Sequence, residues 1–93
     1  MSQAAKHVGR VRKLFPDRSE EVSRLALRSE AFRTICEDYG MAVEALELLQ
    51  VRNLPQDVDK VQEYRVLIQD LEKELQYALL AEQPDEKERS GGR

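Results

Sequence analysis

Few residues in this 93-residue chain could do chemistry, and the cysteine Cys36 and the histidine His7 are the only ones of their types. Cys36 lies in FRTICEDYG, residues 32–40, between two aromatic residues and ahead of two carboxylates. A reactive cysteine needs a thiol pKa lowered by adjacent cations or by a helix N-terminus, whereas Glu37 and Asp38 favour the neutral thiol. We therefore interpret Cys36 as a buried residue of a helix seam. The alternatives are a redox sensor and a disulfide between two copies.

The sequence contains no complete set of residues for catalysis or metal binding. Nucleophilic catalysis needs a nucleophile, a base and an orienting group, and nothing in the pattern places His7 beside Cys36. A structural zinc site takes about four ligands, and di-iron bundles use Glu-x-x-His pairs; neither set occurs. No glycine-rich phosphate loop is present. We predict no catalytic, metal or cofactor-binding residues and no enzyme activity.

Basic residues gather near the N-terminus, although the net charge is −3. Residues 1–33 carry eight Lys/Arg against four Asp/Glu, whereas residues 34–93 carry seven against fourteen. We call residues 1–16 the basic arm, and we expect a short helix within it. Its candidate partner-binding residues are Lys6, Arg10, Arg12 and Lys13. The arm is expected to dock on the acidic part of its own chain or to be disordered. An acidic protein partner, nucleic acid and lipid phosphates are the alternatives.

Apolar residues recur at steps of three and four over most of the remaining chain, which is the period of supercoiled helices. The pattern predicts one helix at about 17–52 and a second at 57–81, joined by the turn Asn53-Leu54-Pro55-Gln56-Asp57. The alternative is a break near Arg28, with Ser29 capping a new helix. Gly40, inside the first helix, marks either the close approach of a neighbouring helix or a local bend.

The short connection predicts an all-α fold, an antiparallel two-helix hairpin over residues 17–82. Residues 83–93 are polar and predict a disordered tail. Each helix is apolar over about half of its circumference, which is wider than a two-helix seam can bury. The surplus could be covered by the N-terminal segment folding back or by a second copy of the chain, and we predict a homodimer whose hairpins form a four-helix bundle. Further candidate partner-binding residues are Met41, Ala45 and Leu48. The residues expected in the core are Val22, Leu25, Phe32, Ile35, Tyr39, Leu46, Leu49, Val61, Ile68, Leu71 and Leu75.

A cytoplasmic location is expected from the same sequence features. A single cysteine forms no intramolecular disulfide and fits a reducing compartment. The first residues, MSQAAKHVGRVRK, do not resemble a signal peptide. No run of 18 apolar residues occurs, so we expect no transmembrane helix.

The order of these motifs resembles the YdcH-like proteins, which are small bacterial helical proteins of unknown function. The shared pattern is Phe-Pro, then Phe-x-x-Leu-x-x-x-Tyr, an apolar helix, a short loop and a charged closing helix. The matching residues are Phe15, Pro16, Phe32, Ile35, Tyr39, Leu46 and Leu49. This chain departs from the pattern in Cys36, Gly40 and a longer basic arm. The resemblance implies a helical hairpin and no catalytic residue.

The function expected from these features is a non-enzymatic, self-associating protein–protein interaction module. The alternative is a nucleic-acid-associated regulator that uses the basic arm.

Overall fold

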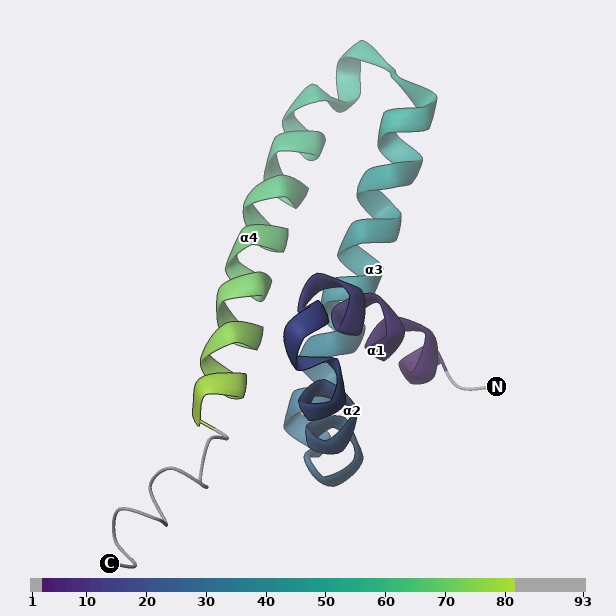
Figure 1. The fold of residues 1–93 in the computed structure, drawn as a ribbon. Coiled ribbons are helices and arrows are strands. Elements are labelled where there is room, and N and C mark those ends of the chain that lie inside the picture. The colour runs from purple at the N-terminus through teal and green to yellow at the C-terminus, as the bar shows by residue number, and fades with distance from the viewer. Residues whose placement is uncertain (1–2, 82–93) are drawn as a thin grey trace, which may run out of the picture.

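The computed structural model describes residues 3–81, where all the regular elements are helical (Figure 1). In chain order they are α1 (Gln3–Leu14), the 3-10 turn η1 (Pro16–Arg18), α2 (Ser19–Arg28), α3 (Glu30–Arg52), the 3-10 turn η2 (Pro55–Asp57) and α4 (Val58–Ala81). The all-α fold class is confirmed. Within this range, no helix combines the length and apolar character needed to cross a membrane. The tail predicted at 83–93 lies outside the described residues.

The single helix predicted over about 17–52 is wrong, because the chain breaks at Ser29. This residue is extended, with φ −122° and ψ 109°. Its backbone N–H donates to the Leu25 carbonyl at 2.9 Å and ends α2. Its Oγ accepts a hydrogen bond from the Phe32 N–H at 3.1 Å, one of the donors left without an intrahelical partner at the start of α3. Ser29 therefore separates two helices that share one apolar rhythm.

The predicted turn between the long helices is confirmed. Asn53 ends α3 in the left-handed conformation, with φ 52° and ψ 47°, and its N–H donates to the Leu49 carbonyl. Asparagine tolerates this conformation better than most residues do. Arg52 then pairs with the buried Asp57 at 2.7 Å across the turn. As a result α4 runs back antiparallel to α3 (Figure 1).

The two short helices cover one end of this hairpin. α1 packs on α3 and α2, and α2 also reaches α4 (Figure 1). The Arg18 guanidinium ties the connection between α1 and α2 to the end of α4, because it donates to the Leu79 carbonyl at 2.9 Å. The core lies where these helices meet. Its buried apolar residues are Val11, Val22, Leu25, Ala26, Phe32, Cys36, Tyr39, Ala42, Leu71, Leu75 and Leu79.

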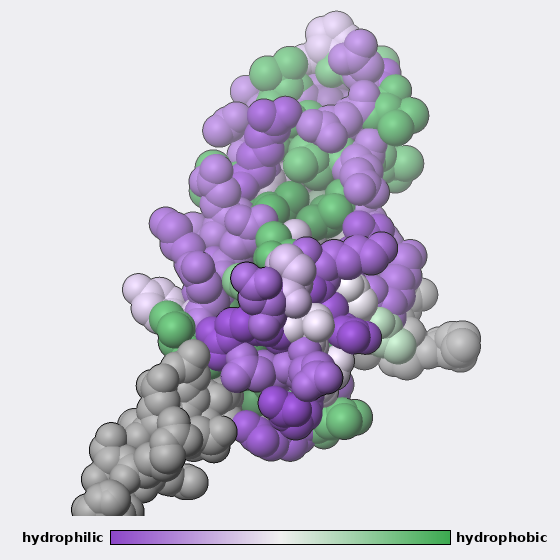
Figure 2. Space-filling model, in the orientation of Figure 1, coloured by the Kyte–Doolittle hydropathy of each residue, from purple (hydrophilic) through white to green (hydrophobic). Residues whose placement is uncertain are grey.

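The other end of the hairpin, residues 46–68, is the distal half, and there the core thins out. Six of the expected core residues are buried: Val22, Leu25, Phe32, Tyr39, Leu71 and Leu75. The other five are only half-buried: Ile35, Leu46, Leu49, Val61 and Ile68. Four of these five lie in the distal half. On the face drawn in Figure 2, apolar residues follow the seam between α3 and α4 there, flanked by hydrophilic residues.

Candidate functional site

The basic arm docks on the hairpin through two of its four candidate cations. Lys6 Nζ lies 2.5 Å from Glu44 Oε2, and Arg10 Nη2 lies 3.3 Å from the same oxygen. Arg10 Nη1 also reaches Glu47 at 3.9 Å. The hydrogen bond from Lys6, followed by the nearby positive charges, lowers the pKa of the Glu44 carboxyl. Because Lys6 and Arg10 face carboxylates of their own chain, they are less available to an external anion.

His7 and Gly40 form the closest approach between α1 and α3. The His7 side chain is 1% exposed. A Cβ placed on Gly40 would overlap the imidazole at Nδ1 and Cγ, so a larger residue at position 40 would displace the ring. Among the described residues, His7 Nδ1 has no hydrogen-bond partner. Of the two interpretations left open for Gly40, the structure selects close approach.

Cys36 is fully buried, one helical turn before Gly40. Burial, and after it the charge of Glu37, raise the pKa of its thiol from 9.0 to about 12. A neutral and inaccessible thiol is a weak nucleophile, so the geometry favours the packing role. Within residues 3–81, no group of three or more His, Cys, Asp or Glu side chains is placed to hold a metal ion.

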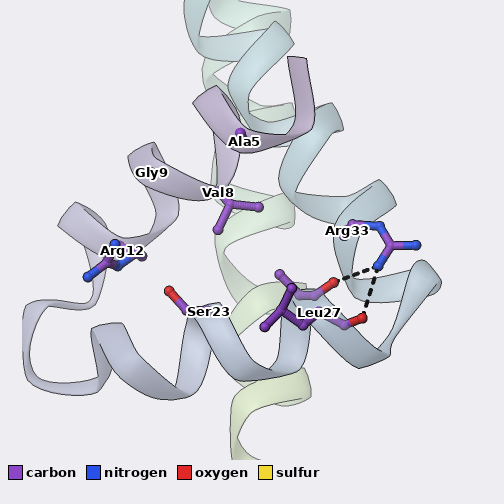
Figure 3. A pocket seen from close by; sticks show the side chains of 8 residues that line it. Ala5, Val8, Gly9, Arg12, Ser23, Leu27 and Arg33 are labelled. Carbon is purple, nitrogen blue, oxygen red and sulfur yellow. Dashed lines mark hydrogen bonds between the residues drawn. The ribbon is translucent and has the colours of Figure 1, made fainter. Parts of the chain in front are cut away.

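The remaining two arm cations, Arg12 and Lys13, are exposed. Arg12 lies at the edge of an open groove of about 420 Å³ between α1 and α2, which Val8 and Leu27 also line (Figure 3). A second arginine of this groove, Arg33, donates from Nη1 to the Ala26 carbonyl at 2.7 Å and to the Leu27 carbonyl at 3.4 Å. Arg33 therefore helps to close the end of α2, as the dashed lines in Figure 3 show.

The predicted apolar residues of α3 form a stripe on a different side of the helix from the docked arm. Met41 is 58% exposed and Leu48 is 64% exposed, and the half-buried Ala45 lies between them. Steps of four and three residues place all three on one side of an α-helix. Ala45 is about 100° around the helix from Glu44, which holds the arm. The structure thus brings together Lys6 and Arg10, and separately the three apolar residues.

The apolar stripe extends onto α4 through Leu67, which is 43% exposed. Met41, Ala45 and Leu67 line a groove of about 450 Å³ between the two long helices. Apolar periodicity alone assigns Leu67 only to the wide apolar side of the second long helix. Its position beside Met41 depends on the register of α4 against α3, which the periodicity of one helix cannot reveal.

Comparison of the chain with family models, curated proteins and solved structures finds no match. The resemblance to the YdcH-like proteins therefore stays a proposal that rests on the motifs quoted above.

Proposed function

We propose that this protein is a non-enzymatic, self-associating protein–protein interaction module, whose hairpins pair as a homodimeric four-helix bundle. The observation that carries the proposal is the apolar surface of the long helices. Large side chains remain exposed on both of them: Met41, Leu48 and Val51 on α3, and Val58, Val66, Leu67, Tyr77 and Leu80 on α4. Soluble monomers rarely leave contiguous apolar patches of more than a few hundred Å² in water. A second hairpin would supply the third and fourth helices that the distal half lacks.

We also propose a cytoplasmic location and a bacterial source for the protein. The free thiol of Cys36 fits a reducing cytoplasm, and the YdcH-like motif order suggests a bacterial source. The alternative function, nucleic-acid binding through the basic arm, is left with Arg12 and Lys13 as the candidate cations that do not pair with Glu44 or Glu47. Because each neutralised phosphate adds about one unit to the salt slope of binding, two cations would support only weak association.

The proposal is tested by the molar mass of the purified protein from light scattering between about 5 and about 200 µM, because dimer formation depends on concentration by mass action. We expect the mass to rise from that of one 10.8 kDa chain toward that of two. A mass of one chain at every concentration would overturn the proposal.

A further inference from the structure

We infer that the second copy docks on the side of the hairpin opposite α1, antiparallel to the first, about a two-fold axis that passes beside Ala45 and Leu67. This inference rests on the proposed self-association and specifies its geometry. We call the docking surface the Met41 face. Its residues are Asp38, Met41, Ala45, Leu48 and Arg52 of α3 and Lys60, Leu67 and Glu74 of α4.

The shape of the Met41 face suits the pairing of α3 with a second α3. Ala45 is small and lies between Met41 and Leu48, which are large and exposed. A small residue at the crossing point lets two helices approach to about 8 Å. In an antiparallel pair centred on Ala45, Met41 of each copy lies opposite Leu48 of the other. The groove of about 450 Å³ beside Ala45 then receives side chains of the second copy.

The charges at the two ends of the α3 stripe complement each other in this arrangement. Asp38 lies seven residues before Ala45 and Arg52 lies seven residues after it. Two heptads return to the same side of the helix, and both residues are exposed. Antiparallel pairing places Asp38 of each copy beside Arg52 of the other. Arg52 donates from one nitrogen to Asp57, and a guanidinium has five N–H donors in all.

The same relation holds on α4 about Leu67. Lys60 lies seven residues before Leu67 and Glu74 seven residues after it, and both are exposed. The antiparallel copy therefore gains a second set of opposite-charge pairs, whereas a parallel copy would place like charges together. Two further carboxylates, Glu63 and Asp70, lie about 40° to 60° further around α4, at the rim away from α3.

The opposite side of the hairpin is less suited to a second hairpin. There α1 and α2 stand on the half that holds the core, so the surface is stepped (Figure 1). The Met41 face carries neither helix. The Met41 faces of two copies can therefore meet along their full length.

A charge placed on the Met41 face tests the inference against a matched control. Leu67→Glu introduces a carboxylate at the centre of the face, and we expect the dimer dissociation constant to rise at least about tenfold. Val66→Glu is the control, because Val66 is similarly exposed, at 47% against 43% for Leu67, but lies about 100° around α4. We expect Val66→Glu to leave the dissociation constant within about twofold of the wild-type value.

Cysteine variants and charge-swap variants test the orientation of the copies without changing the core. Ala45→Cys lies beside the axis, and we expect mild oxidation to link two copies, because disulfides need Cα atoms about 4.4–6.8 Å apart. Gln69→Cys, exposed on another side of α4, is the control and should stay unlinked. Lys60→Glu should weaken the dimer, and the double variant with Glu74→Lys should restore it, since the swapped charges again complement each other.

The outcomes separate the inference from the function it rests on. If the wild-type protein dimerises but Leu67→Glu has no effect and Ala45→Cys does not link, the Met41 face is wrong and self-association stands. If the wild-type protein is a monomer throughout, both fail. Circular dichroism shows whether Leu67→Glu remains folded, and the surface variants Lys60→Glu and Ala45→Cys decide the orientation if it does not.

Discussion

His7 fills the space that a side chain at position 40 would take, so this one residue pair determines how closely α1 approaches α3. The imidazole is buried against the glycine, while Lys6 and Arg10, on the same helix, reach the carboxylates of Glu44 and Glu47. The ion pairs are partly exposed, and exposed pairs contribute little. We therefore expect the packing of His7 to hold the arm more firmly than its charges do.

Gly40→Ala tests this packing, with Gly9→Ala as the matched control. Both changes gain about 1 kcal/mol of helix propensity, but only the first places a Cβ against the His7 ring, since a Cβ on Gly9 meets open space. Overpacking costs about 1–3 kcal/mol. In urea unfolding, Gly40→Ala should be at least about 1 kcal/mol less stable than Gly9→Ala. Equal stabilities would show that the ring moves aside freely. When His7 is also replaced by alanine, Gly40→Ala should no longer be less stable than Gly9→Ala.

Cys36 predicts a loss of stability in alkaline solution. The folded thiol has a pKa of about 12, raised from 9.0 by burial. Between these pH values the unfolded chain releases the proton and the folded chain keeps it, so the free energy of unfolding falls as pH rises, by up to about 1.4 kcal/mol per pH unit. Chemical unfolding measured in steps from pH 8 upward, about half a unit apart, should show this slope.

Cys36→Ala is the variant that identifies the group responsible for this slope. It should flatten the slope just above pH 9. The raised pKa of Tyr39, caused by burial and then by Glu72, lies above 10.0 and affects the higher range in both proteins. An unchanged slope in the variant would assign the loss to another group.

At the scale of the helices, Ser29 separates α2 from α3 and lets α2 turn back across the hairpin. Its Oγ accepts a hydrogen bond from the Phe32 N–H in the first turn of α3, and its own N–H donates to the Leu25 carbonyl in the last turn of α2. Arg33 supports the same junction from α3, through the Ala26 carbonyl. Each helix end at the break therefore has a partner for at least one of its otherwise unpaired backbone groups.

Ser29→Ala should destabilise the fold by about 0.5–2 kcal/mol, because it removes the N-cap of α3. Thr34→Ala is the matched control, since Thr34 Oγ1 donates to the Glu30 carbonyl inside the same helix at 3.1 Å. The Glu30 carbonyl belongs to the backbone hydrogen-bond ladder of α3, and alanine has a higher helix propensity than threonine. We therefore expect Thr34→Ala to cost little stability. Thermal or urea unfolding of both variants distinguishes them. A Ser29→Ala variant as stable as Thr34→Ala would mean that the backbone at the break holds without the cap.

At the scale of the whole molecule, stability is expected to be uneven along the hairpin. The core lies where α1 and α2 cover α3 and α4, and the distal half is a two-helix layer with half-buried Leu46, Leu49 and Val61. A two-helix layer buries less apolar area per residue than the end that α1 and α2 cover, so it opens more readily by local unfolding.

Hydrogen exchange at two protein concentrations tests this unevenness together with the proposed dimer. In dilute protein, the amides of residues 46–52 and 58–68 should exchange faster than those flanking Phe32 and Leu75. At the higher concentration the distal amides should slow, by about the ratio of bound to free protein, because association protects them. Uniform exchange that does not respond to concentration would contradict both expectations.

The sequence by itself determined what depends on neighbours along one helix. The three-and-four rhythm predicted α4 and the later part of α3, and Asn53 and Pro55 predicted the turn between them, because backbone conformation there is a local property. It also singled out Met41, Ala45 and Leu48 as apolar residues beyond the seam.

Only the tertiary structure decided how the helices meet. The apolar rhythm is the same on both sides of Ser29, so it cannot tell a break from a continuous helix. His7 and Gly40, Lys6 and Glu44, and Met41 and Leu67 are far apart in the chain and become neighbours through packing. Periodicity indicates which side of a helix is apolar. The partner of that side depends on the register and crossing angle of separate helices, because all the helices together minimise the apolar area that is exposed to water.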